Sequence, residues 1–302
     1  MEGPLTFFVR PLRKLFHLVN RNTRRGDKRN IAAHYDLGND FFSLWLDPSM
    51  MYSCAIFEPA DISLAEAQKV RLDRVCQRLD LQADDHLVEI GSGWGALALH
   101  AAQHYGCRVT SVTISSQQYA LAKQRVEEAG LADRITIKMQ DYRDLEGQYD
   151  KLVSLEMIEA IGADQYDTYF AKCANLLKPG GRMLIQTITI EDERFESYRK
   201  NVDFIQRYIF PGGCVPSVQV MNSSIAKVTD LTVTRIDDIG LHYATTLNHW
   251  RNNFFARLDE VRQLGYSEAF IRMWEYYLCY CEGGFLERSI SDVHLVAAKP
   301  GA

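Results

Sequence analysis

Several features that would place a protein in a special class are missing from this sequence of 302 residues. No apolar run approaches the roughly 20 residues that a membrane-spanning helix requires, so we expect no transmembrane helix. The seven cysteines form no CxxC pair and are scattered along the chain, which predicts reduced thiols in a cytosolic protein. No histidine pair carries the glutamate of a zinc-protease motif, and we predict no metal site.

Proline is also scarce, and none of the eight prolines is followed by proline or cysteine. Enzymes that methylate nucleic acids normally use a Pro-Pro-aromatic loop or a Pro-Cys nucleophile. The net charge of -5 offers no general phosphate-binding surface either. We therefore expect no nucleic-acid partner.

Positive charge is concentrated at the amino terminus. Residues 1–30 carry a net charge of +6, which leaves -11 for the remainder. Apolar residues recur there at three- and four-residue steps, as in an amphipathic helix with a basic opposite face. Such a helix suits an anionic membrane surface, but a helix that caps the domain or an organelle presequence would have a similar composition. We treat residues 1–30 as a basic amphipathic segment and 31–302 as the main domain.

From residue 63 onward, helical and strand patterns alternate. Strand-like runs cover 86–91, 107–113, 134–139, 150–155, 182–188, 229–237 and 291–298. Helical patterns cover 63–79, 95–105, 116–129, 164–178, 244–263 and 267–287. This alternation predicts a doubly wound α/β fold of seven strands with added helices. The last two helices carry Trp250, Phe254, Phe255, Trp274, Tyr276, Tyr277, Tyr280 and Phe285. We expect core packing for these aromatics, with the wall of an apolar tunnel as the alternative.

Small and polar residues follow the first three strands of this pattern. A glycine loop, EIGSGWG at 89–95, joins the first strand to a helix, which allows a ligand to approach the backbone and helix amides. The next two strands end in residues 113–118 and 140–143, which carry hydroxyl, amide and carboxyl groups. This edge is where open α/β sheets bind ligands. The loop lacks the third glycine of GxGxxG, which favours S-adenosylmethionine over a dinucleotide.

The sequence resembles the cyclopropane fatty-acid synthase family over about residues 28–298. The resemblance rests on HYDLGNDFF at 34–42, YSCA at 52–55, the glycine loop, QDYRDL at 140–145, YIFPGG at 208–213 and YATTL at 243–247. Many bacterial members carry a further amino-terminal domain, so the resemblance implies either a short form or a chain from which that domain has been removed.

This resemblance implies methyl transfer from S-adenosylmethionine to the double bond of an unsaturated acyl chain, commonly in a membrane phospholipid. It also implies a bound bicarbonate that removes a proton from the resulting carbocation. The residues that would hold bicarbonate are Cys54, Glu159, Gln186, Ile188 through its amide, and Tyr243. The residues that would bind the cofactor are Tyr52, Ser53, Gly91, Gly93, Gly95, Thr113, Gln118, Asp141 and Tyr142.

Two positions depart from the family pattern. Gln186 stands where the family has a histidine, and Ala160 replaces the histidine that usually follows the catalytic glutamate. Glutamine donates hydrogen bonds but does not titrate. We therefore expect Gln186 to bias the product between a cyclopropane and a methylene or methyl-branched chain.

Two other functions are compatible with this sequence. One is a small-molecule amine N-methyltransferase, because plant enzymes of that type resemble the same family. The other is a lipid-binding protein with an inactive methyltransferase fold. The reading we favour places the protein in the cytoplasm, peripheral at the inner membrane surface, and leaves a homo-oligomer among its assembly states.

Overall fold

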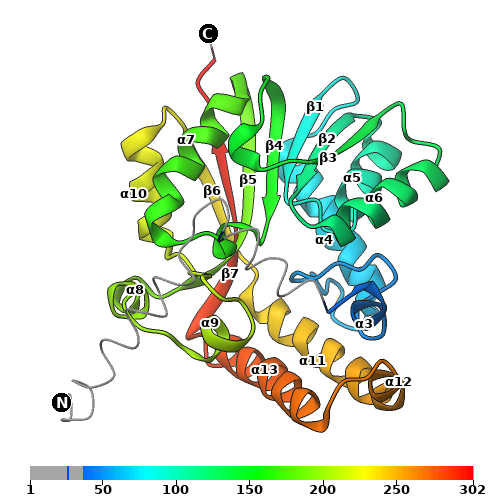
Figure 1. Cartoon of the computed structure of the whole chain (residues 1–302). Helices are drawn as coiled ribbons and strands as arrows, with labels where there is room; N and C mark the ends of the chain where they lie inside the picture. The colour runs from blue at the N-terminus through cyan, green and yellow to red at the C-terminus, as the bar shows by residue number, and fades with distance from the viewer. Residues whose placement is uncertain (1–25, 27–36, 302) are drawn as a thin grey trace.

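A single mixed sheet of seven strands organises the computed structural model, which describes residue 26 and residues 37–301 (Figure 1). The strand order is β3-β2-β1-β4-β5-β7-β6, and β7 runs antiparallel to both of its neighbours, β5 and β6. The strands are β1 (His86–Ile90), β2 (Arg108–Thr113), β3 (Ile135–Met139), β4 (Tyr149–Leu155), β5 (Leu177–Ile190), β6 (Thr232–Asp238) and β7 (Ile290–Ala298). The predicted seven-stranded, doubly wound α/β fold is confirmed.

Both faces of the sheet are covered, because neighbouring residues on the central strands enter different cores. On β1, Leu87 packs with α4 (Leu64–Leu79) and α5 (Ala96–His100), whereas Val88 packs with α7 (Tyr166–Leu176) and α10 (Val218–Val228). Side chains of a strand alternate between the two faces, so apolar residues at successive positions require a layer of helices on each side.

Local sequence explains where several helices begin. Ser63 accepts a hydrogen bond from the amide of Glu66, and the Glu66 side chain accepts one from the amide of Ser63, which forms a capping box at the start of the helical pattern 63–79. Ser115 similarly caps α6 (Ser116–Glu128), and Ser267 caps α13 (Glu268–Leu286). α6 thus begins directly after the turn that follows β2.

A third core lies in a layer of helices beyond the carboxyl ends of the parallel strands (Figure 1). It is formed mainly by α3 (Asn39–Ser43), α11 (Gly240–Ala256) and α13. Trp250, Phe254, Trp274 and Phe285 are almost completely buried in it, as predicted for core aromatics. This layer closes the sheet edge at which the ligand is expected.

The structure differs from the sequence prediction in four places. β5 begins at Leu177 and includes a Pro-Gly-Gly segment, whereas the strand-like pattern starts only at residue 182. The helix predicted for 244–263 breaks at Arg257 into α11 and α12 (Leu258–Gln263), and that predicted for 95–105 ends as a π-helix over Ala101–Tyr105. Between β5 and β6 the chain forms α8 (Asp192–Tyr198), α9 (Phe204–Tyr208) and α10, which the sequence pattern did not indicate. The predicted amphipathic segment 1–30 lies outside the described residues, except for residue 26.

Candidate functional site

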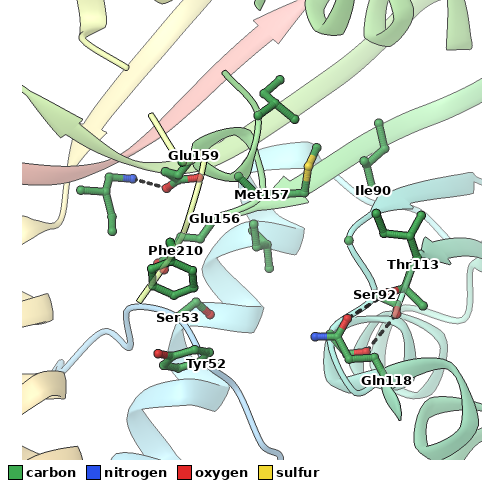
Figure 2. A pocket seen from close by; sticks show the side chains of 18 of the residues that line it. Tyr52, Ser53, Ile90, Ser92, Thr113, Gln118, Glu156, Met157, Glu159 and Phe210 are labelled. Carbon is green, nitrogen blue, oxygen red and sulfur yellow. Dashed lines mark hydrogen bonds between the residues drawn. The ribbon is translucent and has the colours of Figure 1, made fainter. Parts of the chain in front are cut away.

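A cavity of about 270 Å³ lies where the carboxyl ends of β1, β2 and β4 meet the helical layer. Its walls include the glycine loop after β1, the turns after β2 and β3, and the segment after β4. Side chains from α9, α11 and α13 complete it. Figure 2 shows Thr113 and Gln118 on one side of this cavity and Glu156 and Glu159 on the other. Residues predicted to bind the cofactor and the predicted catalytic residue Glu159 therefore border the same cavity.

The loop after β1 has a backbone shape that needs glycine. Gly91, Gly93 and Gly95 have positive φ angles of 95°, 48° and 88°. A Cβ atom on Gly91 would lie 3.3 Å from Cγ of Met157, closer than side chains normally pack. Gly95 does not line the cavity; it precedes α5, and its Cβ atom would lie 3.1 Å from that of Ala122. Its absent side chain instead allows α5 to pack against α6.

Thr113 ends β2, and its hydroxyl group donates to Oε1 of Gln118 over 2.9 Å (Figure 2). Both side chains are buried and line the cavity. Because the carbonyl oxygen of the Gln118 amide is engaged, its NH₂ group is left to donate. A ligand hydroxyl group is a suitable acceptor for it.

Asp141 follows β3, and its carboxylate is paired within the protein. Oδ1 accepts hydrogen bonds of 2.9 Å from the backbone amide and from Nε of Arg143, and Oδ2 lies 2.6 Å from an Arg143 terminal nitrogen. Tyr142 lines the cavity beside it and is 7% exposed. That these two residues hold an adenine ring remains a prediction.

Tyr52 and Ser53 reach the cavity from the segment before α4. The hydroxyl group of Tyr52 lies 2.8 Å from that of Tyr277 on α13. The Ser53 hydroxyl group accepts a hydrogen bond of 3.0 Å from Arg71 on α4. These contacts join the helical layer to the cavity wall.

Taken together, this half of the cavity fits an adenosyl ligand. Gly91 and Gly93 of the glycine loop line this space, and the Gln118 amide borders it as well. Eight of the nine residues predicted to bind S-adenosylmethionine line the cavity, and Gly95 is the exception.

The opposite wall is built around Glu156, which directly follows β4. Oε1 accepts hydrogen bonds from the backbone amide of Cys54 (2.8 Å) and from Nε2 of Gln186 (2.7 Å). Oε2 accepts one from the hydroxyl group of Tyr243 (2.6 Å). No sequence pattern that we used assigns Glu156 a role, although it lies three residues before the predicted Glu159.

Glu159 lines the same cavity, but only one of its two carboxyl oxygens is hydrogen-bonded. Its Oε1 accepts a hydrogen bond of 2.6 Å from the backbone amide of Ile188, whereas its buried Oε2 has no partner. Burial raises the pKa of Glu159 to about 8, and the charge of Glu156 adds to this shift. Glu159 is therefore mainly protonated at neutral pH.

Gln186 and Asp292 lie behind Glu156, away from the cavity lining. Nε2 of Gln186 is 3.2 Å from Oδ2 of Asp292, which belongs to the neighbouring strand β7. Burial and the charge of Glu156 raise the pKa of Asp292 well above its ordinary value. We call Glu156, Glu159 and Asp292 the carboxyl cluster. Sequence patterns missed Asp292 because only strand pairing brings it to the site.

Arg71 is the buried cation that interacts with the carboxyl cluster. Its guanidinium group is inaccessible to solvent, and two of its nitrogens have no hydrogen-bond partner. Burial lowers the pKa of Arg71, and attraction to Glu156 opposes this shift. One buried positive charge therefore interacts with two members of the cluster, Glu156 and Asp292.

The five predicted catalytic residues thus come together, but they do not share one role. Glu159, Ile188 and Tyr243 line the cavity, as does Ala160. Cys54 contributes its backbone amide to Glu156, while burial raises the pKa of its thiol well above the ordinary value. Of the eight aromatic residues considered for an acyl tunnel, only Tyr277 lines the cavity.

Comparisons with known proteins agree on one family. The model of the mycolic acid cyclopropane synthetase family matches residues 22–295. A tuberculostearic acid methyltransferase, UfaA1 of Mycobacterium tuberculosis, is 44% identical over 87% of this chain and 63% of its own length. The cyclopropane-fatty-acyl-phospholipid synthase of Escherichia coli strain K12 is 44% identical over 88% of this chain and 66% of its own length.

A solved structure gives the same result. The crystal structure of the mycolic acid cyclopropane synthase CmaA1, in complex with SAH and CTAB, superposes with a TM-score of 0.84. It is 32% identical and covers 90% of this chain and 98% of that one. The chain spans about two thirds of the length of the two curated relatives.

Proposed function

The chain belongs to the mycolic acid cyclopropane synthetase family, and on this premise we propose that it transfers a methyl group from S-adenosylmethionine to an unsaturated fatty acyl chain. The observation that carries the proposal is the shared cavity, which has the glycine loop on one side and the carboxyl cluster on the other (Figure 2). A methyl donor and a proton acceptor would thus face the same substrate atoms.

The cavity suits this chemistry because its lining is mainly apolar. When bound, S-adenosylmethionine supplies an electrophilic methyl group. An alkene is a weak nucleophile, and its attack leaves a carbocation in the acyl chain, which water would destroy. Apolar side chains, among them Ile161, Phe210 and Leu247, line the cavity and would shelter the cation. The aromatic faces of Tyr52 and Tyr243 would help to stabilise it.

The acyl chain of a membrane phospholipid is the substrate form that we favour. In this proposal the protein works in the cytoplasm at the inner membrane surface. No helix among the described residues is long and apolar enough to cross a membrane. Attachment would instead come from the basic segment 1–30, whose charge of +6 would attract anionic lipids. If deletion of that segment leaves vesicle association unchanged at low salt, this part of the proposal is wrong.

Bicarbonate, which the family resemblance implies, does not fit the arrangement of donors. The Cys54 amide, Gln186 and Tyr243 all direct their hydrogens at Glu156, and the Ile188 amide donates to Glu159. A bicarbonate ion would have to displace a carboxylate that is covalently part of the wall. We therefore derive no step through bicarbonate.

The product is a cyclopropane or a methylene or methyl-branched chain, depending on which proton leaves and on whether a hydride shifts first. Direct loss of a proton from the added methyl group closes a ring, and loss from a neighbouring chain carbon leaves a methyl-branched alkene. A hydride shift onto the first cation, followed by proton loss from the methyl group, leaves a methylene group. Gln186 helps to hold Glu156 in place, so we expect it to influence this choice. Ala160 adds only a small apolar surface to the wall.

Methylation of a small amine is the competing function. An amine attacks the methyl group directly and forms no carbocation, so neither an apolar shelter nor a buried carboxyl cluster is needed. The presence of both favours the lipid substrate. A protein that binds lipid without turnover would bind vesicles but transfer no label.

The test is to incubate the protein with methyl-labelled S-adenosylmethionine and vesicles of monounsaturated phospholipid. Mass spectrometry and NMR would then identify the fatty acids. Label in the acyl chains would establish the reaction and its product. Cofactor binding without label in lipid, combined with transfer to amines, would favour the competing function.

A further inference from the structure

We propose that the carboxylate of Glu156 is the built-in base of this reaction and takes the place that a bound bicarbonate would otherwise fill. The inference deepens the proposed function and rests on it. Three hydrogen-bond donors converge on Glu156. They come from parts of the chain 102, 30 and 87 residues away, namely Cys54, Gln186 and Tyr243.

These donors are among the groups that the family resemblance assigns to bicarbonate. Each of these donors already forms its hydrogen bonds within the protein. The Cys54 amide and the Tyr243 hydroxyl group donate to Glu156, and the two N–H groups of the Gln186 amide face Glu156 and Asp292. Oε1 of Glu156 accepts two hydrogen bonds and Oε2 accepts one, so Oε2 retains capacity to accept a proton. Glu156 also lines the cavity, as does Tyr243, the donor to its Oε2.

Charge favours the same assignment. Burial raises the pKa of Glu159 and of Asp292 and so favours their protonated forms, while burial lowers the pKa of Arg71 and attraction to Glu156 opposes that shift. In this proposal Glu156 carries the one negative charge that faces Arg71. An additional anion beside Glu156 would meet strong repulsion in a poorly solvated space. The cluster thus provides for one negative charge, and the protein itself supplies it.

The backbone conformation of Glu156 also supports its role as the base. Its φ is +51°, in the left-handed region that costs energy for a residue with a Cβ atom. Glycine would relieve this strain, yet the chain places a long acidic side chain there. Strained residues of this kind concentrate at functional sites, and the carboxylate that it positions explains why strain is tolerated here.

Glu156 removes a proton from the carbocation that methyl transfer leaves in the acyl chain. The π electrons of the alkene form a bond to the methyl carbon, the carbon–sulfur bond breaks, and the cofactor leaves as a neutral thioether. Glu156 then accepts a proton, either from the added methyl group or from a neighbouring chain carbon. The released electron pair closes the ring or forms a new double bond. C–H bonds beside a carbocation are strongly acidic, so a carboxylate is an adequate base, and its charge also stabilises the cation.

Glu156→Gln and Glu156→Gly test this assignment in buffer freed of carbon dioxide. We expect the wild-type rate of label transfer to be unchanged when bicarbonate is added. Glu156→Gln keeps the shape but removes the base, so its rate should fall about 10²- to 10⁴-fold. Glu156→Gly removes the carboxylate and frees the donors, so its low rate should rise when bicarbonate is supplied.

Glu193→Gln on exposed α8 is the matched control and should behave like wild type. Titration with S-adenosylhomocysteine and thermal unfolding would show that each variant is folded and binds the cofactor product. A wild-type rate that depends on bicarbonate would overturn the inference, as would a folded Glu156→Gln variant that retains full activity.

A second readout does not depend on turnover. Carbon-13 NMR of labelled bicarbonate should show no bound ion with wild type and a bound ion with Glu156→Gly. Bicarbonate bound to wild type would overturn the inference even if the substrate were not a lipid. Failure to label lipid while both NMR results hold would count against the proposed function alone.

Discussion

Nε2 of His294 lies 3.1 Å from Oε1 of Gln186, its partner across the antiparallel pair β5–β7. Burial lowers the pKa of His294 to about 3, so the ring is neutral at physiological pH and carries one proton. Nδ1 has no partner, which places that proton on Nε2, where it is donated to Gln186. The Gln186 amide is thereby held with its NH₂ group toward Glu156 and Asp292.

We predict that His294→Leu lowers kcat by about tenfold, a barrier increase of about 1.4 kcal/mol. Without the imidazole donor, the Gln186 amide is free to turn its oxygen toward Glu156 and disturb that carboxylate. S-adenosylhomocysteine affinity should not change, because His294 does not line the cavity. His294→Gln keeps a donor and should restore part of kcat. Equal loss in both variants would contradict this positioning role.

Gln186→His should raise the cyclopropane share of the product relative to the methylene or methyl-branched share. Gln186 uses two N–H groups to hold Glu156 and Asp292, whereas one face of an imidazole offers a single N–H group. The Glu156 carboxylate would therefore shift relative to the cation. Gas chromatography with mass spectrometry of the labelled fatty acids measures the ratio. An unaltered ratio in an active variant would refute the role given to Gln186.

Thr113→Val should weaken S-adenosylhomocysteine binding by about tenfold, or about 1.4 kcal/mol. The substitution removes the hydroxyl group that fixes Gln118 and leaves the buried Oε1 of that amide unpaired. Isothermal titration calorimetry measures the change. Thr136→Val, at an exposed position on neighbouring β3, is the control and should bind as wild type does. Equal affinity in wild type and both variants would show that the Thr113–Gln118 pair does not contribute to cofactor binding.

Stability should depend on pH through Glu159. Its pKa rises from 4.5 to about 8 on folding, so between these values the folded state binds a proton that the unfolded state lacks. The free energy of unfolding should therefore fall as pH rises through this window, by up to about 1.4 kcal/mol per pH unit for this group. Urea unfolding at about pH 5.5 and about pH 7.5 would show a smaller fall in Glu159→Gln than in wild type. Equal falls would show that Glu159 is ionised in the folded protein.

The cofactor side of the site could be predicted from sequence because it is local. Glycines, hydroxyl groups and amides follow successive strands, and parallel strands bring their carboxyl ends to one edge. Thus Gly91, Thr113 and Gln118 lie at the cavity as expected. Helix ends with caps, such as Ser63, were predictable for the same reason.

The reacting side could not be predicted in the same way. Glu156 resembles any polar residue after a strand, and its role depends on donors distant in the sequence. Asp292 becomes part of the site only because β7 pairs antiparallel with β5. Helices α8 to α10 lack the regular alternation that marks the other elements, so they too escaped the sequence pattern.

The two sides of the cavity also differ in contact order. The bond from Thr113 to Gln118 spans five residues, whereas the bonds that hold Glu156 and Gln186 span as many as 108. Local contacts form early in folding, and those that close long loops form late. A chain whose helical layer opens transiently would lose the base while its glycine loop stays intact. On heating, methyl transfer should therefore cease before the capacity to bind the cofactor is lost.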